Sequence, residues 1–502
     1  MQLTDLSEEQ LAELLTSKPY VRLLAEHAAA DPDARALTVD GVTLTRSELE
    51  SRSNQWARAL AGHGVGFGDF VTIALPNSVD YFLALIGTWK VGAVPQPVSP
   101  VLPQVERQAI VDLADSRLVV GADGADHPGR ACLPLGFAPD AGTDASPLPE
   151  VLAPAAKAPT SGGSTGRPKL IVSGTAAETS PAAISWLTGM LPGETQLVCG
   201  PLYHNAPLIN SINGLILGHH VIVLRKFDAH AALDAIGAHR VTYLQVVPTM
   251  MLRMHRLLEE GTDTTYDLSS IRQLWHMAAP CPPWLKQAWI DRLGPEQVME
   301  LYGGTEGQAV TRLTGTEWLE HRGTVGKPFF GEMKVLDDDG NQVAPGEIGE
   351  IYMKSPIGVP ATYRYIGAEA KSHDGWDTLG DLGWMDEDGY LYVSDRRLDL
   401  ILSGGANVYP AEVEAAIESH PDVHCCVVVG VADADLGQRV HAVVQTDAEL
   451  DADALRGHLA DRIVRYKIPR TFEFTTEALR DDAGKVRRSA VRDAVAARLT
   501  NA

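Results

Sequence analysis

The chain has 502 residues, of which 45% are hydrophobic and 21% are charged. A chain of this length exceeds what one hydrophobic core usually serves, so two or more domains are expected. The formal net charge of −23, from 42 Lys and Arg against 65 Asp and Glu, argues against a nucleic-acid backbone or an anionic membrane surface as a partner.

The five cysteines show none of the spacings that bind zinc, and no disulfide framework is expected. Cys425 and Cys426 lie in an apolar run that favours a buried strand. The first residues are acidic and have no apolar core, so they do not predict a signal peptide. No run approaches the length of a membrane span. We therefore expect a cytoplasmic protein without a membrane partner.

The first 120 residues alternate between helical and strand patterns. Thr45 and Glu48 form a capping box that opens a helix running to about His63. This alternation predicts a parallel or mixed sheet covered on both faces. Residues 121–160 are rich in Asp, Pro, Ala and Gly, and predict a solvated excursion. The other expected helices span 7–30 as a pair, 79–91 and 105–114, and the expected strands span 36–39, 70–75, 93–95 and 118–120.

Alternation resumes after residue 160 and predicts a second α/β lobe. From Val325 onward, short strands with glycine turns predict a small β-barrel or meander. Beyond about Arg396 the pattern predicts an α+β unit large enough to be a separate domain. The predicted fold is thus α/β, with two α/β lobes and a small β-barrel in residues 1–395 and a smaller α+β domain in residues 396–502. Helices are expected near 181–190, 208–217, 452–465, 488–499 and from Pro410, and strands near 196–199, 221–224, 423–431, 439–446 and 471–475.

Residues 161–169 read SGGSTGRPK and combine three glycines, three hydroxyls and two cations. Glycines let backbone N–H groups approach an anion, hydroxyls add donors and can ligate Mg²⁺, and cations balance the charge. The stretch therefore predicts a phosphate-binding loop. Arg167 and Pro168 separate its lysine from the last glycine, unlike a P-loop, so we expect it to join two strands. The alternative is a mobile surface linker.

Four further residues suit a nucleotide site. Glu306 could ligate Mg²⁺ between phosphates or be a structural residue at a strand end. Asp381 could accept hydrogen bonds from both ribose hydroxyls, although alone it would be only a turn residue. Arg396 could reach a phosphate or ribose, or belong to a surface ion-pair cluster. Lys485, taken alone, would be a solvated surface lysine.

Taken together and in this order, these stretches resemble the acyl-adenylate-forming superfamily of acyl-CoA synthetases, peptide-synthetase adenylation domains and firefly luciferase. The resemblance covers nearly the whole chain, and the joint spacing of its motifs makes it specific. The motifs that carry it are residues 161–169, Tyr302 to Glu306, Thr378 to Asp381, Asp395 to Pro410 and Gly484 with Lys485.

The resemblance implies an acid-thiol ligase of the AMP-forming acyl-CoA synthetase type, which uses ATP, Mg²⁺ and coenzyme A. The carboxylate of a small-molecule acid would attack the α-phosphate, pyrophosphate would leave, and a thiol would then displace AMP from the acyl-AMP. The small domain would rotate about a hinge between the two steps. The alternatives are an enzyme that loads an acyl carrier protein, a nucleotide-binding homologue without catalysis, and a luciferase-like oxygenase. The resemblance leaves open whether the protein forms a homodimer.

The resemblance also implies roles by position. Lys485 would bridge the substrate carboxylate and the α-phosphate, and His204 would lie near that carboxylate or be a buried, hydrogen-bonded histidine. Thr165 and Glu306 would hold Mg²⁺. Tyr302 would stack near adenine, while Asp381 would hold the ribose hydroxyls with support from Arg396. The remaining nucleotide-binding positions are Ser161, Gly162, Gly163, Ser164, Gly166, Lys169, Ala278, Ala279, Pro280, Gly303 and Thr305.

An apolar acyl pocket is also expected. No Asp stands beside Asn205 to pair an amino-acid ammonium, so a bulky or aromatic acid is favoured over a plain fatty acid. Gly404 and Gly405 follow the hinge in a segment similar to that of CoA ligases, which favours free CoA as the acceptor. Leu398 stands where a hinge Asp or Lys is expected, and Gly162 where many members have Ser. The expected pocket residues are Tyr203, His204, Asn205, Ala206, Val247, Trp275, His276, Gly303 and Gly304.

Overall fold

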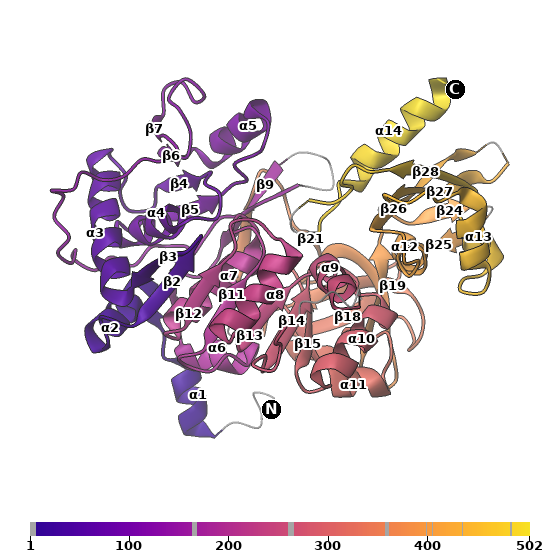
Figure 1. Cartoon of the computed structure of the whole chain (residues 1–502), viewed down its shortest axis with the longest axis horizontal. Coiled ribbons are helices and arrows are strands. Elements are labelled where there is room, and N and C mark those ends of the chain that lie inside the picture. The colour runs from indigo at the N-terminus through magenta and orange to yellow at the C-terminus, as the bar shows by residue number, and fades with distance from the viewer. Residues whose placement is uncertain are drawn as a thin grey trace.

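The computed structural model describes residues 7–162, 168–259, 266–356, 361–397, 399–403, 405–433, 435–481 and 484–501. Figure 1 shows a large body that contains α1 to β23, and a smaller body beside it that contains β24 to α14. The predicted fold class is confirmed, because α/β lobes, an antiparallel sheet and a final α+β unit follow one another along the chain. The exact boundary between residues 395 and 396 stays a prediction.

The largest sheet crosses the large body in the strand order β17-β16-β15-β14-β13-β11-β12-β2-β3. Strands β2 and β11 to β15 run parallel, whereas β3, β16 and β17 pair in antiparallel fashion. The strands β2 and β3 come from the first lobe, so the two lobes share this sheet. The element order alone did not predict that sharing. The bounds are β2 (Arg35–Val39), β3 (Val42–Thr45), β11 (Thr195–Val198), β12 (His220–Val223), β13 (Tyr243–Val246), β14 (Gln273–Met277), β15 (Val298–Gly303), β16 (Val310–Thr314) and β17 (Lys327–Phe330).

Helices cover both faces of this sheet. Trp275 of β14 packs in one hydrophobic cluster with residues of α2, α3, α4 and α7, while Leu274 packs in another with residues of α8, α9 and α10. The two clusters lie on opposite faces because consecutive side chains of a strand point in opposite directions. The helices are α1 (Glu8–Leu15), α2 (Tyr20–Ala30), α3 (Arg46–Gly62), α4 (Val79–Lys90), α5 (Gln104–Ala114), α6 (Pro181–Thr188), α7 (Asn205–Ile216), α8 (Ala229–His239), α9 (Pro248–Glu259), α10 (Pro283–Leu293) and α11 (Gly315–Glu320).

Three smaller sheets complete the two lobes. A parallel sheet consists of β5 (Val94–Pro97), β4 (Phe70–Ile73), β6 (Leu118–Val120) and β7 (Ala131–Leu133), and an antiparallel sheet of β20 (Tyr363–Ile366), β9 (Pro168–Ser173) and β8 (Thr160–Gly162). β1 (Lys18–Pro19) pairs with β10 (Glu178–Thr179). The glycine-rich loop therefore joins two strands, as predicted. The solvated excursion expected over residues 121–160 is wrong in part, because this stretch contains β7 and buries Ala153, Ala155, Ala156 and Ala158.

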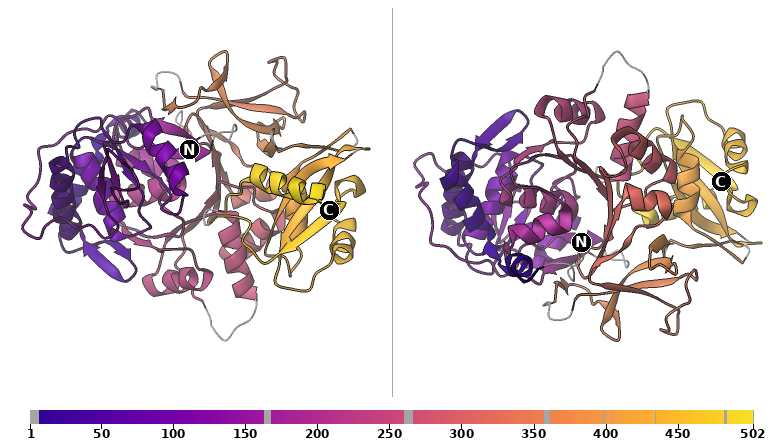
Figure 2. Two further views of the ribbon diagram at one scale, coloured as in Figure 1. Left: turned by 90° about the horizontal axis from the view of Figure 1, so that it is seen from above. Right: turned by 90° about the horizontal axis from the view of Figure 1, so that it is seen from below.

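The remaining elements form an antiparallel sheet and the final α+β unit. In Figure 2 the orange sheet and the yellow unit lie at the same end of the large body. The first sheet contains β18 (Glu332–Leu336), β19 (Gly349–Lys354), β21 (Lys371–His373), β22 (Trp376–Met385) and β23 (Leu391–Arg396). The final unit contains β24 (Ile401–Ser403), β25 (Ala406–Val408), α12 (Pro410–Glu418), β26 (Cys425–Asp433), β27 (Gly437–Gln445), α13 (Ala452–Ala460), β28 (Thr471–Thr475) and α14 (Arg488–Asn501).

Two properties of the whole chain follow from these elements. In the part of the chain that the structure describes, no helix is long and apolar enough to cross a membrane. Cys425 and Cys426 are buried in β26, which confirms the predicted strand.

Candidate active site

Lys169, Glu306 and Tyr365 form what we call the Glu306 cluster, where β9, β20 and the turn after β15 meet. The hydroxyl of Tyr365 donates a 2.6 Å hydrogen bond to Glu306 Oε1. Lys169 Nζ lies 3.7 Å from the same oxygen and 3.8 Å from the centre of the Tyr365 ring. Burial lowers the pKa of Lys169, and the charge of Glu306 opposes that shift. Tyr365 thus holds both charged groups in place.

Glu306 suits a hard cation on one side. A Cβ at Gly304 would lie 2.7 Å from Glu306 Oε2, so the absence of a side chain there leaves room for the carboxylate. In the described structure, Oε2 accepts no hydrogen bond, unlike Oε1. Mg²⁺ uses one or two protein carboxylates and completes its shell with water and phosphate oxygens, and Glu306 fits that need. The described residues contain no group of three or more His, Cys, Asp or Glu side chains that could hold a metal alone.

Tyr302, Asp381 and Arg396 form a second group, the Asp381 cluster. The Tyr302 hydroxyl donates to Asp381 Oδ2 at 2.8 Å, and Arg396 Nε lies 3.4 Å from Asp381 Oδ1. Asp381 and Arg396 are direct partners in the β22–β23 ladder, which places both side chains on one face of the sheet. Burial raises the pKa of Tyr302 well above its usual value, with Asp381 adding to the shift, so the phenol stays a neutral donor.

A turn of the final α+β unit reaches these groups. The Lys485 N–H donates to Asp481 Oδ1 at 2.8 Å, and Asp481 Oδ2 lies 3.7 Å from His204 Nε2 at the start of α7. Gly484 has φ +73°, and a Cβ there would lie 2.6 Å from Thr249 Oγ1 on α9. The turn therefore packs directly on the large body, between α7 and α9.

The pKa values of Lys485 and His204 depend on charged groups of both the large body and the final unit. Burial lowers the pKa of Lys485, Asp481 and Glu306 oppose the shift, and Arg396 adds to it. Lys485 is therefore close enough to sense both the Glu306 cluster and the Asp381 cluster. Burial also lowers the pKa of His204, with Asp481 opposing the shift and Lys485 adding to it. At neutral pH the His204 imidazole is uncharged.

Two further contacts, outside the site, hold the final unit against the large body. Arg487, just after the turn, makes two hydrogen bonds of 2.8 and 3.3 Å to the carboxylate of Glu106 on α5. Arg256 of α9 donates to the Val423 carbonyl and lies 3.3 Å from Nδ1 of His424. These contacts dock the final unit on the large body, and the turn among them carries Lys485 into the site.

The predicted acyl-pocket residues divide into two groups. The rings of Tyr203 and His204 lie 4.6 Å apart at the start of α7, and in the described chain the buried Oδ1 of Asn205 has no hydrogen-bond partner. Trp275, 1% exposed, lies on the face of the sheet that α7 covers. His276 lies on the opposite face, where its Nδ1 is 3.8 Å from Glu300 Oε1. The structure therefore separates His276 from Trp275 and from the ring pair of Tyr203 and His204.

Other predicted positions surround the two clusters. Ala278, directly after β14, has φ +73°, which costs an alanine about 1–2 kcal/mol and is typical of residues held in place at a site. Thr305 is half-buried beside Glu306, and Gly303 ends β15 where a Cβ would lie 2.7 Å from Val310 Cγ1. Val247 is buried near Gly484, and Gly405 has φ +81° between β24 and β25. Ala206 is half-buried in α7, and Ala279 and Pro280 follow Ala278.

Several predicted residues lie outside the described residues: Gly163, Ser164, Thr165, Gly166, Leu398 and Gly404. Ser161 and Gly162 end β8, and Ser161 pairs with Lys169 of the Glu306 cluster. Sequence reasoning missed Tyr365 and Asp481. The alternation of Tyr363, Arg364 and Tyr365 in a strand could have placed both tyrosines on one face, but their partners are distant in sequence.

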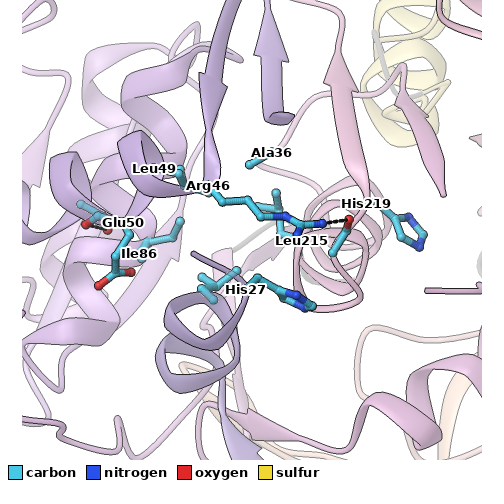
Figure 3. Close-up of a pocket in the computed structure, with 11 residues that line it drawn as sticks. His27, Ala36, Arg46, Leu49, Glu50, Ile86, Leu215 and His219 are labelled. Atoms are coloured by element: carbon cyan, nitrogen blue, oxygen red, sulfur yellow. Dashed lines mark hydrogen bonds between the residues drawn. The ribbon is translucent and has the colours of Figure 1, made fainter. Parts of the chain in front are cut away.

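Of two cavities among the described residues, only the larger shares a lining residue with these clusters. Figure 3 shows a small one between α2, α3, α4 and α7, where Arg46 donates to the Gly218 carbonyl at 2.8 Å. Its volume of about 10 Å³ holds about one water, too little for a substrate. A larger cleft of about 480 Å³ adjoins the Glu306 cluster and is lined in part by Gln308, Tyr365 and Asp377.

Comparison with known proteins identifies the family. Residues 24–364 match the AMP-binding enzyme family, and residues 412–485 match the AMP-binding enzyme C-terminal domain. The chain is 30% identical to the 2-succinylbenzoate–CoA ligase of Bacillus licheniformis, over 93% of this chain and 98% of that protein. It is 33% identical to a feruloyl-CoA synthase from an Amycolatopsis species, over 93% of this chain and 96% of that protein.

Solved structures agree with this family. The o-succinylbenzoate CoA synthetase of Bacillus subtilis, in complex with an acyl-adenylate intermediate, has a TM-score of 0.81 and 28% identity, covering 95% of this chain and 99% of that chain. An amide bond synthetase from Marinactinospora thermotolerans has a TM-score of 0.77 and 26% identity, with 95% and 99% covered. The chain belongs to the AMP-binding enzyme family. The predicted resemblance to adenylate-forming acyl-CoA synthetases, and the prediction of an acid-thiol ligase, are confirmed.

We expect Gly484→Ala to loosen the docked turn, because its methyl group would meet Thr249 Oγ1 and alanine resists a φ of +73°. Hydrogen exchange measured by mass spectrometry should show faster exchange in the turn that carries Lys485 and at the start of α9. Gly457→Ala is the matched control, since a Cβ there has open space within a helix. Unchanged exchange around Gly484 would contradict this packing.

Proposed function

We propose that this protein activates a carboxylic acid with ATP to an acyl-AMP, releasing pyrophosphate, and then transfers the acyl group to the thiol of coenzyme A. The observation that carries the proposal is the insertion of the Lys485 turn between His204 and Thr249, beside both the Glu306 and Asp381 clusters. This arrangement suits the first step, in which a carboxylate and an α-phosphate must meet. The CoA ligases among the relatives support the second step.

The first step needs no protein nucleophile, because the substrate carboxylate itself attacks the α-phosphate in line. Two anions must approach each other, so positioning and charge stabilisation supply the catalysis. Lys485 would contact both anions, and the neutral His204 would adjoin the carboxylate without adding a second charge. Asp381 and Arg396 would hold the ribose. Glu306 and Thr165 would hold Mg²⁺, which would neutralise charge on the phosphates.

The substrate is proposed to be a bulky or aromatic acid. The rings of Tyr203 and His204 lie 4.6 Å apart at the start of α7, and aromatic surfaces suit an aromatic acid. Relatives named for 2-succinylbenzoate and ferulate support this class, whereas one named for sulfoacetate shows that the family also includes a ligase for a small acid. The sequence contains no Asp beside Asn205. The structure nevertheless places a carboxylate near His204, that of Asp481 in the final unit.

The second step needs Lys485 to withdraw, and we propose that the final unit rotates about a hinge near Leu398. The Arg397 N–H donates to the Gly380 carbonyl at 2.9 Å, and its guanidinium bonds Glu350 at 3.1 Å, both in the large body. Asp399 instead pairs with Arg488 of the final unit at 3.3 Å. Arg397 therefore bonds the large body, whereas Asp399 bonds the final unit. This change of partner supports a pivot between the two residues and a mobile domain over roughly residues 396–502. Rotation would bring Gly404 and Gly405 toward the incoming thiol.

The activity is tested by incubating the protein with ATP, Mg²⁺ and a panel of aromatic, polycyclic and fatty acids, with and without CoA. Mass spectrometry should detect acyl-CoA for at least one bulky or aromatic acid, only when CoA is present. Acyl-AMP that accumulates and ignores CoA would instead favour a carrier-protein acceptor. A panel in which fatty acids alone react would contradict the proposed substrate class, and silence across the panel would favour a binder without catalysis.

Lys485→Ala should abolish acyl-AMP formation but spare transfer from preformed acyl-AMP to CoA, because Lys485 contacts the reacting groups only in the first step. Removing one charged group from a transition state of this kind costs about 10²–10³ in rate. Lys467→Ala is a matched control, since this lysine of the same unit pairs with Glu412 on the surface. Equal loss in both half-reactions would contradict the assignment.

A further inference from the structure

Lys157 lies on the same face of a β-sheet as Lys169. The Lys157 carbonyl accepts a 2.9 Å hydrogen bond from the Ser173 N–H, and the Pro159 carbonyl accepts one of 2.9 Å from Ile171. These bonds continue the β8–β9 ladder backward from Thr160, which pairs with Leu170. Residues that face each other across an antiparallel ladder share a face, as do residues two apart. Lys157, Lys169 and Ile171 therefore point to one side.

The other side of this sheet is a hydrophobic core. Ala158, Leu170 and Val172 alternate with the residues named above, and they pack in a cluster with Val94 and Ile110. All three are at most 1% exposed. The face that carries Lys157 is consequently the face turned away from this core, where Tyr365 and Glu306 lie. Tyr365 belongs to it because it pairs with Ile171 in the β20–β9 ladder.

Electrostatics agree with this placement. Burial lowers the pKa of Lys157 to about 8, and the negative charge of Glu306 opposes the shift. The ammonium group therefore stays mostly protonated at pH 7. The charge of Glu306 also opposes the lowering of the pKa of Lys169 and of Lys485, so all three lysines respond to the same carboxylate.

The charge of one carboxylate, that of Glu306, acts on two lysines of this face. Glu306 is already bound by Tyr365 and close to Lys169, so Lys157 brings a cation beyond what Glu306 needs. The next carboxylate along the face, Asp377, is held by hydrogen bonds from the hydroxyls of Tyr363 and Ser372. A half-buried ammonium without a matching anion is costly, and an anionic ligand removes that cost.

We propose that Lys157 binds the β- and γ-phosphates of ATP, and therefore the pyrophosphate leaving group, as a second lysine of the phosphate site. This inference rests on the proposed function, because it uses the nucleotide site described there. It assigns a ligand contact to a residue that precedes the glycine-rich loop and has no part in its SGGSTGRPK pattern. The phosphates of ATP would then be held by two lysines of the same sheet face, Lys169 and Lys157.

The test measures binding by calorimetry, with no acid substrate needed. The ligands are ATP with Mg²⁺, inorganic pyrophosphate with Mg²⁺, and AMP. Lys157→Met should weaken ATP and pyrophosphate about tenfold or more, the usual cost of losing a hydrogen bond to a charged group, and leave AMP unchanged. Lys157→Arg should restore part of the loss. Lys334→Met removes a lysine of β18 that lies 4.4 Å from the ring of Trp376 on β22. This variant should change none of the three affinities.

Three outcomes of these binding measurements would overturn the inference. Unchanged affinity for pyrophosphate in Lys157→Met would show that Lys157 does not contact the phosphates. An equal loss of affinity for AMP and for ATP would show that Lys157 shapes the site and does not bind these phosphates. Equal melting temperatures of the variant and the wild type would establish that the variant is folded. A wild type that binds no pyrophosphate would also overturn it. A wild type that binds ATP and pyrophosphate yet activates no acid would overturn the proposed function while leaving the lysine assignment in place.

Discussion

The arrangement of the site depends on the contact between the Gly484 turn and α9. Lys485 comes from a different structural unit than every other predicted catalytic group, so the site is complete only while that turn is docked. The turn fits because Gly484 has no side chain and adopts a backbone conformation that other residues resist. Docking is supported elsewhere by the Arg487–Glu106 ion pair and by Arg256 at Val423. An exposed ion pair contributes about 1 kcal/mol or less, so these contacts favour the docked position without fixing it permanently.

Charge is the second constraint. An acidic chain with a net charge of −23 must gather its cations locally to hold a polyanion. Here Lys169 lies 3.7 Å from Glu306, whose charge also acts on Lys157 and Lys485, and Arg396 lies beside Asp381. Each carboxylate is bound by a tyrosine hydroxyl, Glu306 by Tyr365 and Asp381 by Tyr302. A neutral donor fixes the orientation of a carboxylate without consuming its charge, which leaves that charge to balance the neighbouring cations.

The sequence predicted most elements, because their signals are local. The capping box of Thr45 and Glu48 placed the start of α3, and the apolar run around Cys425 and Cys426 placed β26. It did not predict that β2 joins the sheet of the second lobe, since strand pairing across nearly 200 residues leaves no local pattern. Residues 121–160 were misjudged because buried alanines resemble those of a loop in composition.

For the site, the resemblance selected Glu306, Asp381, Arg396 and Lys485, which lie near one another in the structure. It could not identify Tyr365, Asp481 or Lys157, because their roles follow from strand register and domain docking. His276 shows the converse problem. Two consecutive residues of a strand, here Trp275 and His276, cannot both face one side, and alternation turns His276 toward Glu300.

The most direct test of the account is to lock the docked arrangement covalently. Glu106→Cys and Arg487→Cys together, joined by a short bis-maleimide, would tie the Lys485 turn to α5. Each single variant treated with the same reagent is the control, because native thiols also react. With an acid that the protein activates, the account predicts that the cross-linked enzyme still forms acyl-AMP but no longer forms acyl-CoA. Formation of acyl-CoA at the rate of the single variants would contradict it.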